Sequence, residues 1–325
     1  MSLINTVRAT VLSIANKNNF GYITPADFNL YAKQAQLDIF EDYFYQYNSQ
    51  IVKQNARVSG SGYADIVKGI EEVIDTFTVF APLSKSIVSY PSSLYILPNQ
   101  EKNGSDYYII NKILVYQKQK TSGTNTQIQG GQNRLIDSSA DFFASGVVLG
   151  DIVSYRINAI TYNQKVIAIN SSTQLTIDAN NLSSINIPYI IYDYSKLKEA
   201  EKVTHSKITM LSNSMLTKPT LPYPAYTQNS LDAQIYPDTI TDMGQVTSQY
   251  IRYPKDPNWT YFNIITGGEP SFDETALDYQ DFELPLSDET NIINKILQYA
   301  GMSIREAALV QFGKAEEKEA TTQEG

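Results

Sequence analysis

The sequence predicts an α+β protein in which a helical core carries an inserted small β-barrel and an extended arm rich in Pro and Tyr. Three observations lead to this fold class. Apolar residues recur at helical spacing near both ends of the 325-residue chain. Short apolar runs bounded by Gly, Asn, Asp and Ser fill its middle. A proline-rich segment then separates this middle part from the C-terminal helices.

The N-terminal part is predicted to form three helices. Leu3, Val7 and Val11 lie on one face of the first. Thr24 is a suitable N-cap for the second, and Pro25 suits the first helical position. The third is expected to run from Ala64 to Phe77, with its apolar residues on one face.

The middle of the chain is predicted to form strands. The first two are expected at 107–110 and 113–116, and the polar stretch 121–132 is expected to be a linker. From 134 to 194, short apolar runs predict a small barrel that closes its own edges. Its strands are expected within Val147–Val153, Lys165–Ile169, Gln174–Ile177 and Tyr189–Tyr192.

The C-terminal part is expected to return to the core. A helix is predicted over 197–216, followed by an extended arm over 218–224, because Pro interrupts both helices and β-ladders. A helix from Ser287 is expected to stop at Gly301, and Ser303 with Glu306 has the spacing of a capping box for a last helix. The domains are then 1–125 (helical core with strands), 126–194 (barrel), 195–313 (continuation of the core) and 314–325 (disordered tail).

The composition argues against an enzyme. The chain has no cysteine, which excludes disulfides and thiolate sites, and His205 is its only histidine. No phosphate-binding loop, metal motif or nucleophile motif is present, so no catalytic, cofactor or metal residue is assigned.

The start of the chain does not predict a secretory signal, and no apolar run predicts a membrane span. The 24 tyrosines fit either half-buried strands or a surface rich in interfaces.

The negative charge is concentrated in one segment. Nine acidic residues and no Lys or Arg occur between Asp256 and Asn294, and the rest of the chain is balanced, so this segment accounts for the net charge of −9. It is either a solvated acidic loop or a docking strip for a basic partner. If it is a docking strip, nine carboxylates without internal partners would be stabilised by basic groups from outside.

Several stretches resemble neck and tail-ring proteins of short-tailed, crAss-like bacteriophages. They are GYITPADFNLYAKQAQ (21–36), YIRYPKDPNW (250–259), FELP (282–285) and LQYAGMSIR (297–305), and the first is similar to the opening helix pair of head-to-tail connectors. The runs 137–142 and 146–153 are similar to small barrels of phage virion proteins. Connectors of this type are usually shorter than this chain.

The resemblance implies a connector-like helical core and a closed ring of about twelve identical subunits. The ring would stack on the portal, contact adjacent neck or tail ring proteins, and pass genomic DNA without sequence-specific binding during ejection. The protein would be assembled in the host cytoplasm and reside in the virion, with no membrane or cofactor. The candidate interface residues are Asp273, Glu274, Asp278, Asp281, Phe282, Arg252, Tyr253, Pro219 and Tyr223.

Two other functions remain as alternatives. The barrel could be the binding unit of a peripheral virion protein that docks fibres or binds host glycans. A virion-associated hydrolase is the third possibility, although no catalytic signature supports it.

Overall fold

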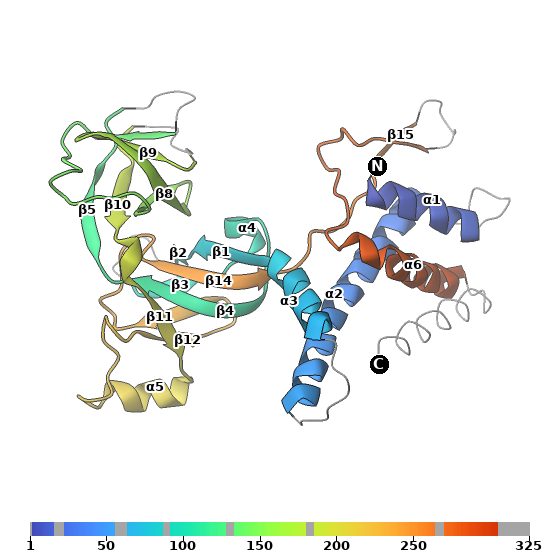
Figure 1. Ribbon diagram of the computed structural model, residues 1–325, viewed down its shortest axis with the longest axis horizontal. Coiled ribbons are helices and arrows are strands. Elements are labelled where there is room, and N and C mark those ends of the chain that lie inside the picture. The colour runs from blue at the N-terminus through green and yellow to red at the C-terminus, as the bar shows by residue number, and fades with distance from the viewer. Residues whose placement is uncertain are drawn as a thin grey trace. The chain divides into compact units, whose positions relative to one another are not determined.

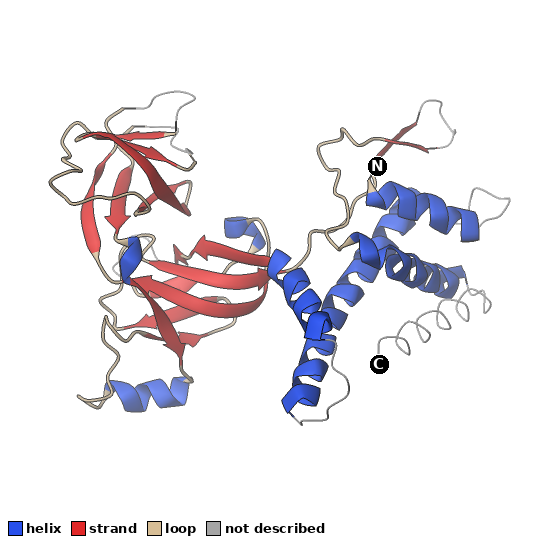
Figure 2. Cartoon of the chain, viewed as in Figure 1, coloured by secondary structure: helices blue, strands red, loops and turns tan. Residues whose placement is uncertain are grey.

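The computed structural model describes residues 2–15, 23–55, 64–86, 92–127, 133–179, 185–263 and 270–304 (Figures 1 and 2). It confirms an α+β protein. The chain forms two compact units, Met1–Phe77 with Tyr253–Gly325, and Thr78–Arg252. The predicted tail 314–325, residues 128–132 of the predicted linker, Glu269 and Glu306 lie outside the described residues.

The first unit is mainly helical. It contains α1 (Leu3–Ala15), α2 (Pro25–Asn55), α3 (Ala64–Thr76), the short helix η2 (Leu286–Asp288) and α6 (Glu289–Ile304), with a small hairpin of β15 (Tyr261–Asn263) and β16 (Pro270–Phe272). Helix α6 packs against α1 and α2, and α3 packs against α2. The unit is thus assembled from both ends of the chain.

Two helix boundaries test the sequence-based expectations. The start of α2 is confirmed, because the main-chain N–H of Asp27 donates to Thr24 Oγ1 (3.2 Å), and that of Thr24 donates to Asp27 Oδ2 (3.4 Å). The expected stop at Gly301 is wrong, since α6 continues to Ile304. Gly301 is buried, and packing against other helices outweighs the low helix propensity of one glycine.

The second unit contains an eight-stranded sheet with the order β1-β14-β4-β11-β12-β13-β3-β2. Its strands are β1 (Thr78–Pro82), β2 (Ser84–Lys85), β3 (Leu94–Ile96), β4 (Tyr107–Tyr116), β11 (Leu197–Lys202), β12 (Ala225–Gln228), β13 (Asp232–Tyr236) and β14 (Val246–Arg252), with the short helix α4 (Gln100–Asn103) between β3 and β4. The two edge strands, β1 and β2, are separated by Leu83 alone. The sheet therefore curls until its edges nearly meet, which makes it barrel-like.

Residues 197–216 correct the prediction of one continuous helix. The segment is strand β11 followed by α5 (His205–Ser212). Strand β11 is antiparallel to β4 and parallel to β12, and parallel neighbours require a crossover, which α5 supplies. The sequence Leu-Lys-Glu-Ala-Glu-Lys favours a helix, but Ala200 is its only buried residue and strand pairing on both sides outweighs local propensity.

The residues predicted to form a barrel belong to a six-stranded sheet with the order β5-β10-β7-β8-β9-β6. Its strands are β5 (Gln119–Thr124), β6 (Arg134–Ile136), β7 (Ile152–Ile157), β8 (Ile160–Ser171), β9 (Gln174–Ile177) and β10 (Pro188–Tyr192). It is a curled half-barrel, so the expected edge closure is not reached. Edge strand β6 has only three residues, and one bridge, Gln127↔Ile136, joins it to the chain after β5. The predicted linker is wrong at 121–124, which belong to β5.

The two sheets of the second unit are joined by specific contacts. The rings of Tyr116 and Tyr192 stack 5.3 Å apart beside Ile152. The side-chain amide of Asn163 donates to the carbonyl of Gly244 at 3.0 Å. Gly244 has a φ of +66°, and a Cβ there would lie 2.2 Å from Ser154 Oγ, so only glycine fits this approach.

The chain enters and leaves the second unit at neighbouring positions. Strands β1 and β14 pair along their length, with Thr78 opposite Ile251. Phe77 and Tyr253 are the residues of the helical unit next to these two strands. Their rings both lie against the ring of Phe40, at 5.1 and 6.1 Å between centroids. The second unit is therefore an insertion whose two ends lie close together.

Candidate interaction surfaces

The one histidine lies in an open groove of about 660 Å³ at the N-terminus of α5. Its Nε2 atom is 3.4 Å from the main-chain oxygen of Gln228. The described residues that line this groove include Tyr107, Lys202 and Thr204 but no carboxylate. Among the described residues, no three Asp, Glu or His side chains gather where they could hold a metal ion.

Asp281, one of the candidate interface residues, caps a helix of its own unit. One carboxylate oxygen accepts the N–H of Leu3 at 2.9 Å and the other accepts that of Ile4 at 2.7 Å. The second oxygen also accepts the N–H of Phe282 at 2.8 Å. A carboxylate at this position satisfies free N–H groups and interacts favourably with the helix dipole. Phe282 is 8% exposed and belongs to the core.

Other acids of the segment also have partners inside the chain. Asp256 pairs with Lys33 (2.6 Å), and Glu283 accepts the N–H of Lys255 at 2.8 Å. Asp288 is buried and accepts a hydrogen bond from the hydroxyl of Tyr43. The premise that the nine carboxylates lack internal partners is therefore wrong for these residues.

The exposed part of the segment is a turn, which we call the acidic turn and define as residues 273–279. Asp273 accepts hydrogen bonds from Thr275 N and Oγ1, at 2.9 and 2.7 Å, and these bonds lower the pKa of Asp273. Glu274 and Asp278 are exposed, and between them Leu277 is fully exposed (107%). Asp278 also accepts from the side-chain amide of Asn258 at 3.2 Å.

Pro219 and Tyr223 lie in a compact turn, which corrects the expectation of an extended arm. The main-chain groups of Thr220 and Tyr223 exchange two hydrogen bonds, of 3.2 and 2.9 Å. Pro219 and Pro224 are buried, while Tyr223 is 81% exposed. The buried prolines flank this turn, and Pro222, which is exposed, lies within it, where its fixed φ suits a turn ahead of β12.

Arg252 and Tyr253 mark the return from the second unit to the first. Arg252 is the last residue of β14 and lies opposite Tyr107 of β4. Tyr253 is 36% exposed and contacts Phe40 of α2. Arg252 thus ends the sheet strand, and Tyr253 packs within the helical unit.

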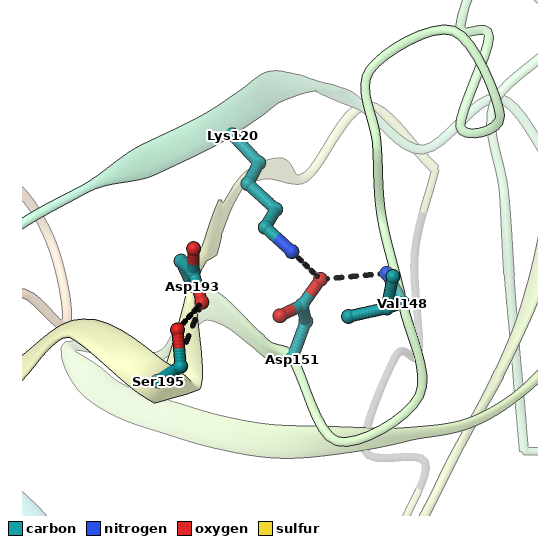
Figure 3. Close-up of polar contacts among 5 residues, drawn as sticks. All are labelled: Lys120, Val148, Asp151, Asp193 and Ser195. Carbon is teal, nitrogen blue, oxygen red and sulfur yellow. Dashed lines mark hydrogen bonds and ion pairs between the residues drawn. The ribbon is translucent and has the colours of Figure 1, made fainter.

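Sequence reasoning missed a buried ion pair in the half-barrel (Figure 3). Lys120 Nζ is 2.7 Å from Asp151 Oδ2, and their side chains are only 9% and 2% exposed. The same oxygen accepts the N–H of Val148 at 2.7 Å, so the pair holds the loop before β7 in place. Nearby, hydrogen bonds from Ser195 lower the pKa of Asp193, helped by the charges of Lys120 and Lys118.

That loop presents a further exposed apolar patch. Phe143, Val148 and Leu149 are 60%, 53% and 65% exposed. In the sequence, only the Gly150-Asp151 pair indicated a turn here, and the apolar run that contains it was predicted to be a strand. Residues 147–150 lie outside the strands, and Leu149 and Gly150 form a turn that is held because Asp151 accepts the N–H of Val148.

No protein-family model matches the sequence, and no curated protein matches it. Among the described residues, none of the helices is both long and apolar enough to cross a bilayer.

Proposed function

We propose that this chain is a structural subunit of a bacteriophage virion, a head-to-tail connector or neck ring protein. Identical subunits, about twelve by the family resemblance, would close into a ring that stacks on the portal and on adjacent ring proteins. The ring would extend the channel through which genomic DNA leaves the capsid, without sequence-specific binding and without a cofactor. The helical unit would be the connector-like core and the second unit its insertion.

The observation that carries this proposal is the group of fully exposed apolar side chains on hydrogen-bonded turns. Met215, Leu216 and Leu277 are 101%, 98% and 107% exposed. Large apolar side chains that are exposed next to one another on ordered surface, as Met215 and Leu216 are, mark contact sites. These turns lie in both units of the chain, as a subunit with several neighbours requires.

Assembly of the purified chain tests the proposal. Negative-stain electron microscopy and light scattering should show closed rings of one size, either alone or on addition of the portal protein of the same phage. An image of the intact particle labelled through a tag on this chain should place it at the neck or tail. A chain that stays monomeric with and without portal protein would contradict the proposal.

The exposed loop of the half-barrel favours one other function, a peripheral module that docks fibres or binds host glycans. Aromatic and aliphatic side chains on a loop held by a buried ion pair can stack on a sugar or pack on a fibre. Replacing Phe143 and Leu149 with Ser should abolish host adsorption if this function holds. Ring assembly should be unchanged by the same replacements if the half-barrel is peripheral.

A further inference from the structure

The segment His205–Tyr223, which we call the α5 knob, presents several strongly exposed apolar side chains in the second unit. Met210, Met215, Leu216 and Tyr223 are 74%, 101%, 98% and 81% exposed. In Figure 1, α5 lies on the opposite side of the eight-stranded sheet from the half-barrel. Four large side chains are therefore presented on one projecting element.

The α5 knob is ordered before it binds. Ile208 is buried, and Leu211 packs with it against Ala225 of β12. Lys218 N donates to the carbonyl of Ser214 at 3.0 Å, and the Thr220–Tyr223 turn closes the segment. A backbone that is already fixed loses little conformational entropy on binding, which suits a docking surface.

The α5 knob is basic, whereas the acidic turn has the opposite charge around a similar exposed apolar tip. The knob contains Lys207 and Lys218 and no Asp or Glu. Lys207 lies 3.6 Å from Glu201, with both side chains more than half exposed. The acidic turn carries Asp273, Glu274 and Asp278 around Leu277 and contains no Lys or Arg. The α5 knob and the acidic turn thus carry opposite charges, and each has an exposed apolar tip.

We propose that the α5 knob of one copy of this chain docks on the acidic turn of a second copy. Met215 and Leu216 would cover Leu277, while Lys207 and Lys218 would face Glu274 and Asp278. The occupant of the knob is a second copy because the complementary surface is present in the same sequence. This inference rests on the proposed ring function.

The contact joins two different surfaces, so each copy keeps one free knob and one free acidic turn. Such a head-to-tail contact propagates and closes into a ring when the rotation between copies permits it. The charged rim would set orientation and make association depend on salt, while the apolar tips would supply most of the affinity.

The chain has no cysteine, so introduced cysteines can form disulfides only with each other. Leu216→Cys and Leu277→Cys variants of the full chain are mixed under mild oxidation and run on a non-reducing gel. We expect the mixture to give a covalent dimer and either variant alone to give at least about tenfold less, because only the mixed pair is in contact. The chain with both changes should give a ladder of covalent oligomers. A fast-running monomer from that chain, closed within one copy, would overturn the proposal, as would no cross-link in any mixture.

Charge reversal is an independent test that needs no oxidation. Lys207→Glu with Lys218→Glu, or Glu274→Lys with Asp278→Lys, should each weaken self-association at least about tenfold in sedimentation velocity. The chain with all four changes should recover to within about threefold of the original. Lys118→Glu with Lys198→Glu is the matched control, equal in charge change and outside both turns, and should have little effect.

The outcomes separate this contact from the function on which it rests. Rings that form normally in every charge variant would overturn the contact and leave the ring function standing. A wild-type chain that stays monomeric at every concentration, both alone and with portal protein, would overturn both. Circular dichroism of each variant checks that the fold is intact, so that loss of association is not loss of structure.

Discussion

At the scale of single residues, carboxylates that look alike in the sequence have different roles. Asp278 lies exposed on a turn, whereas Asp281, three residues later, accepts main-chain N–H groups at the start of α1. The sequence shows a charge run but does not show which acid reaches a helix start nearly 280 residues away. This contact is long-range, so local pattern could not predict it.

Asp281→Asn should destabilise the helical unit by about 1–2 kcal/mol, because an amide can satisfy only part of the N–H groups that the carboxylate caps and loses the interaction with the helix dipole. Chemical denaturation followed by circular dichroism measures this loss. Asp278→Asn is the matched control and should change stability by less than about 0.5 kcal/mol, as exposed substitutions do. Equal effects of the two changes would contradict the capping role.

Asp288 should give the helical unit a distinct pH dependence. Burial raises the pKa of Asp288 above its ordinary value of 3.8, and hydrogen bonds from Tyr43 and Asn291 only partly oppose this. The folded state therefore binds more protons than the unfolded chain just above that value, so this group's contribution to stability falls as pH rises through its folded pKa. Asp288→Asn should remove this contribution.

The measurement is the stability of Asp288→Asn relative to wild type, by urea denaturation at several pH values from about 4 to 7. The difference should shift in favour of the variant as pH rises. A difference that stays flat over this range would show that the carboxyl is ionised in the folded state throughout. Glu274→Gln, on the exposed acidic turn, is a suitable comparison variant.

At the scale of elements, local signals identified helix starts and several strands. Thr24 and Pro25 predicted the start of α2, and the runs at 174–177 and 189–192 are strands β9 and β10. Elements held by distant partners were mispredicted, as β11 was, because Lys and Glu favour helices locally and only the pairing with β4 and β12 makes it a strand. The projecting α5 knob escaped notice for the same reason, since its shape depends on packing against β12.

The half-barrel should be removable at the positions where β4 and β11 meet. Tyr116 lies opposite Leu197, and Gln117 N donates to the carbonyl of Lys196 at 2.9 Å. Deleting Lys118–Ser195 and joining the ends with a two-residue Asn-Gly turn would convert β4 and β11 into a hairpin. Cutting at 134 and 194 instead would leave β5 without its partner β10.

The deletion variant should keep a cooperative transition in thermal unfolding, with some loss of stability because Tyr116 loses its stacking partner Tyr192. Adding Tyr116→Ser, which replaces the newly exposed ring with a polar group, should improve solubility. Loss of cooperative unfolding in both forms would show that the eight-stranded sheet depends on the half-barrel.

At the scale of the whole molecule, the chain builds one unit from its two ends and places another between them. Strands β1 and β14, which begin and end the second unit, are paired. Its buried clusters draw on residues from 83 to 246. An inserted domain with neighbouring ends and its own core can fold by itself.

The fragment Thr78–Arg252 should therefore fold alone and unfold cooperatively in urea. Its ends are already paired in the β1–β14 ladder, so cutting there leaves the apolar clusters intact. Joining Phe77 to Tyr253 with a short Gly-Ser linker should likewise give a folded helical unit, because both rings lie against Phe40. The transitions of the two pieces should match those of the full chain. If instead the fragment is unfolded while the full chain is stable, the second unit needs the helical unit to fold, and the two would form one cooperative structure.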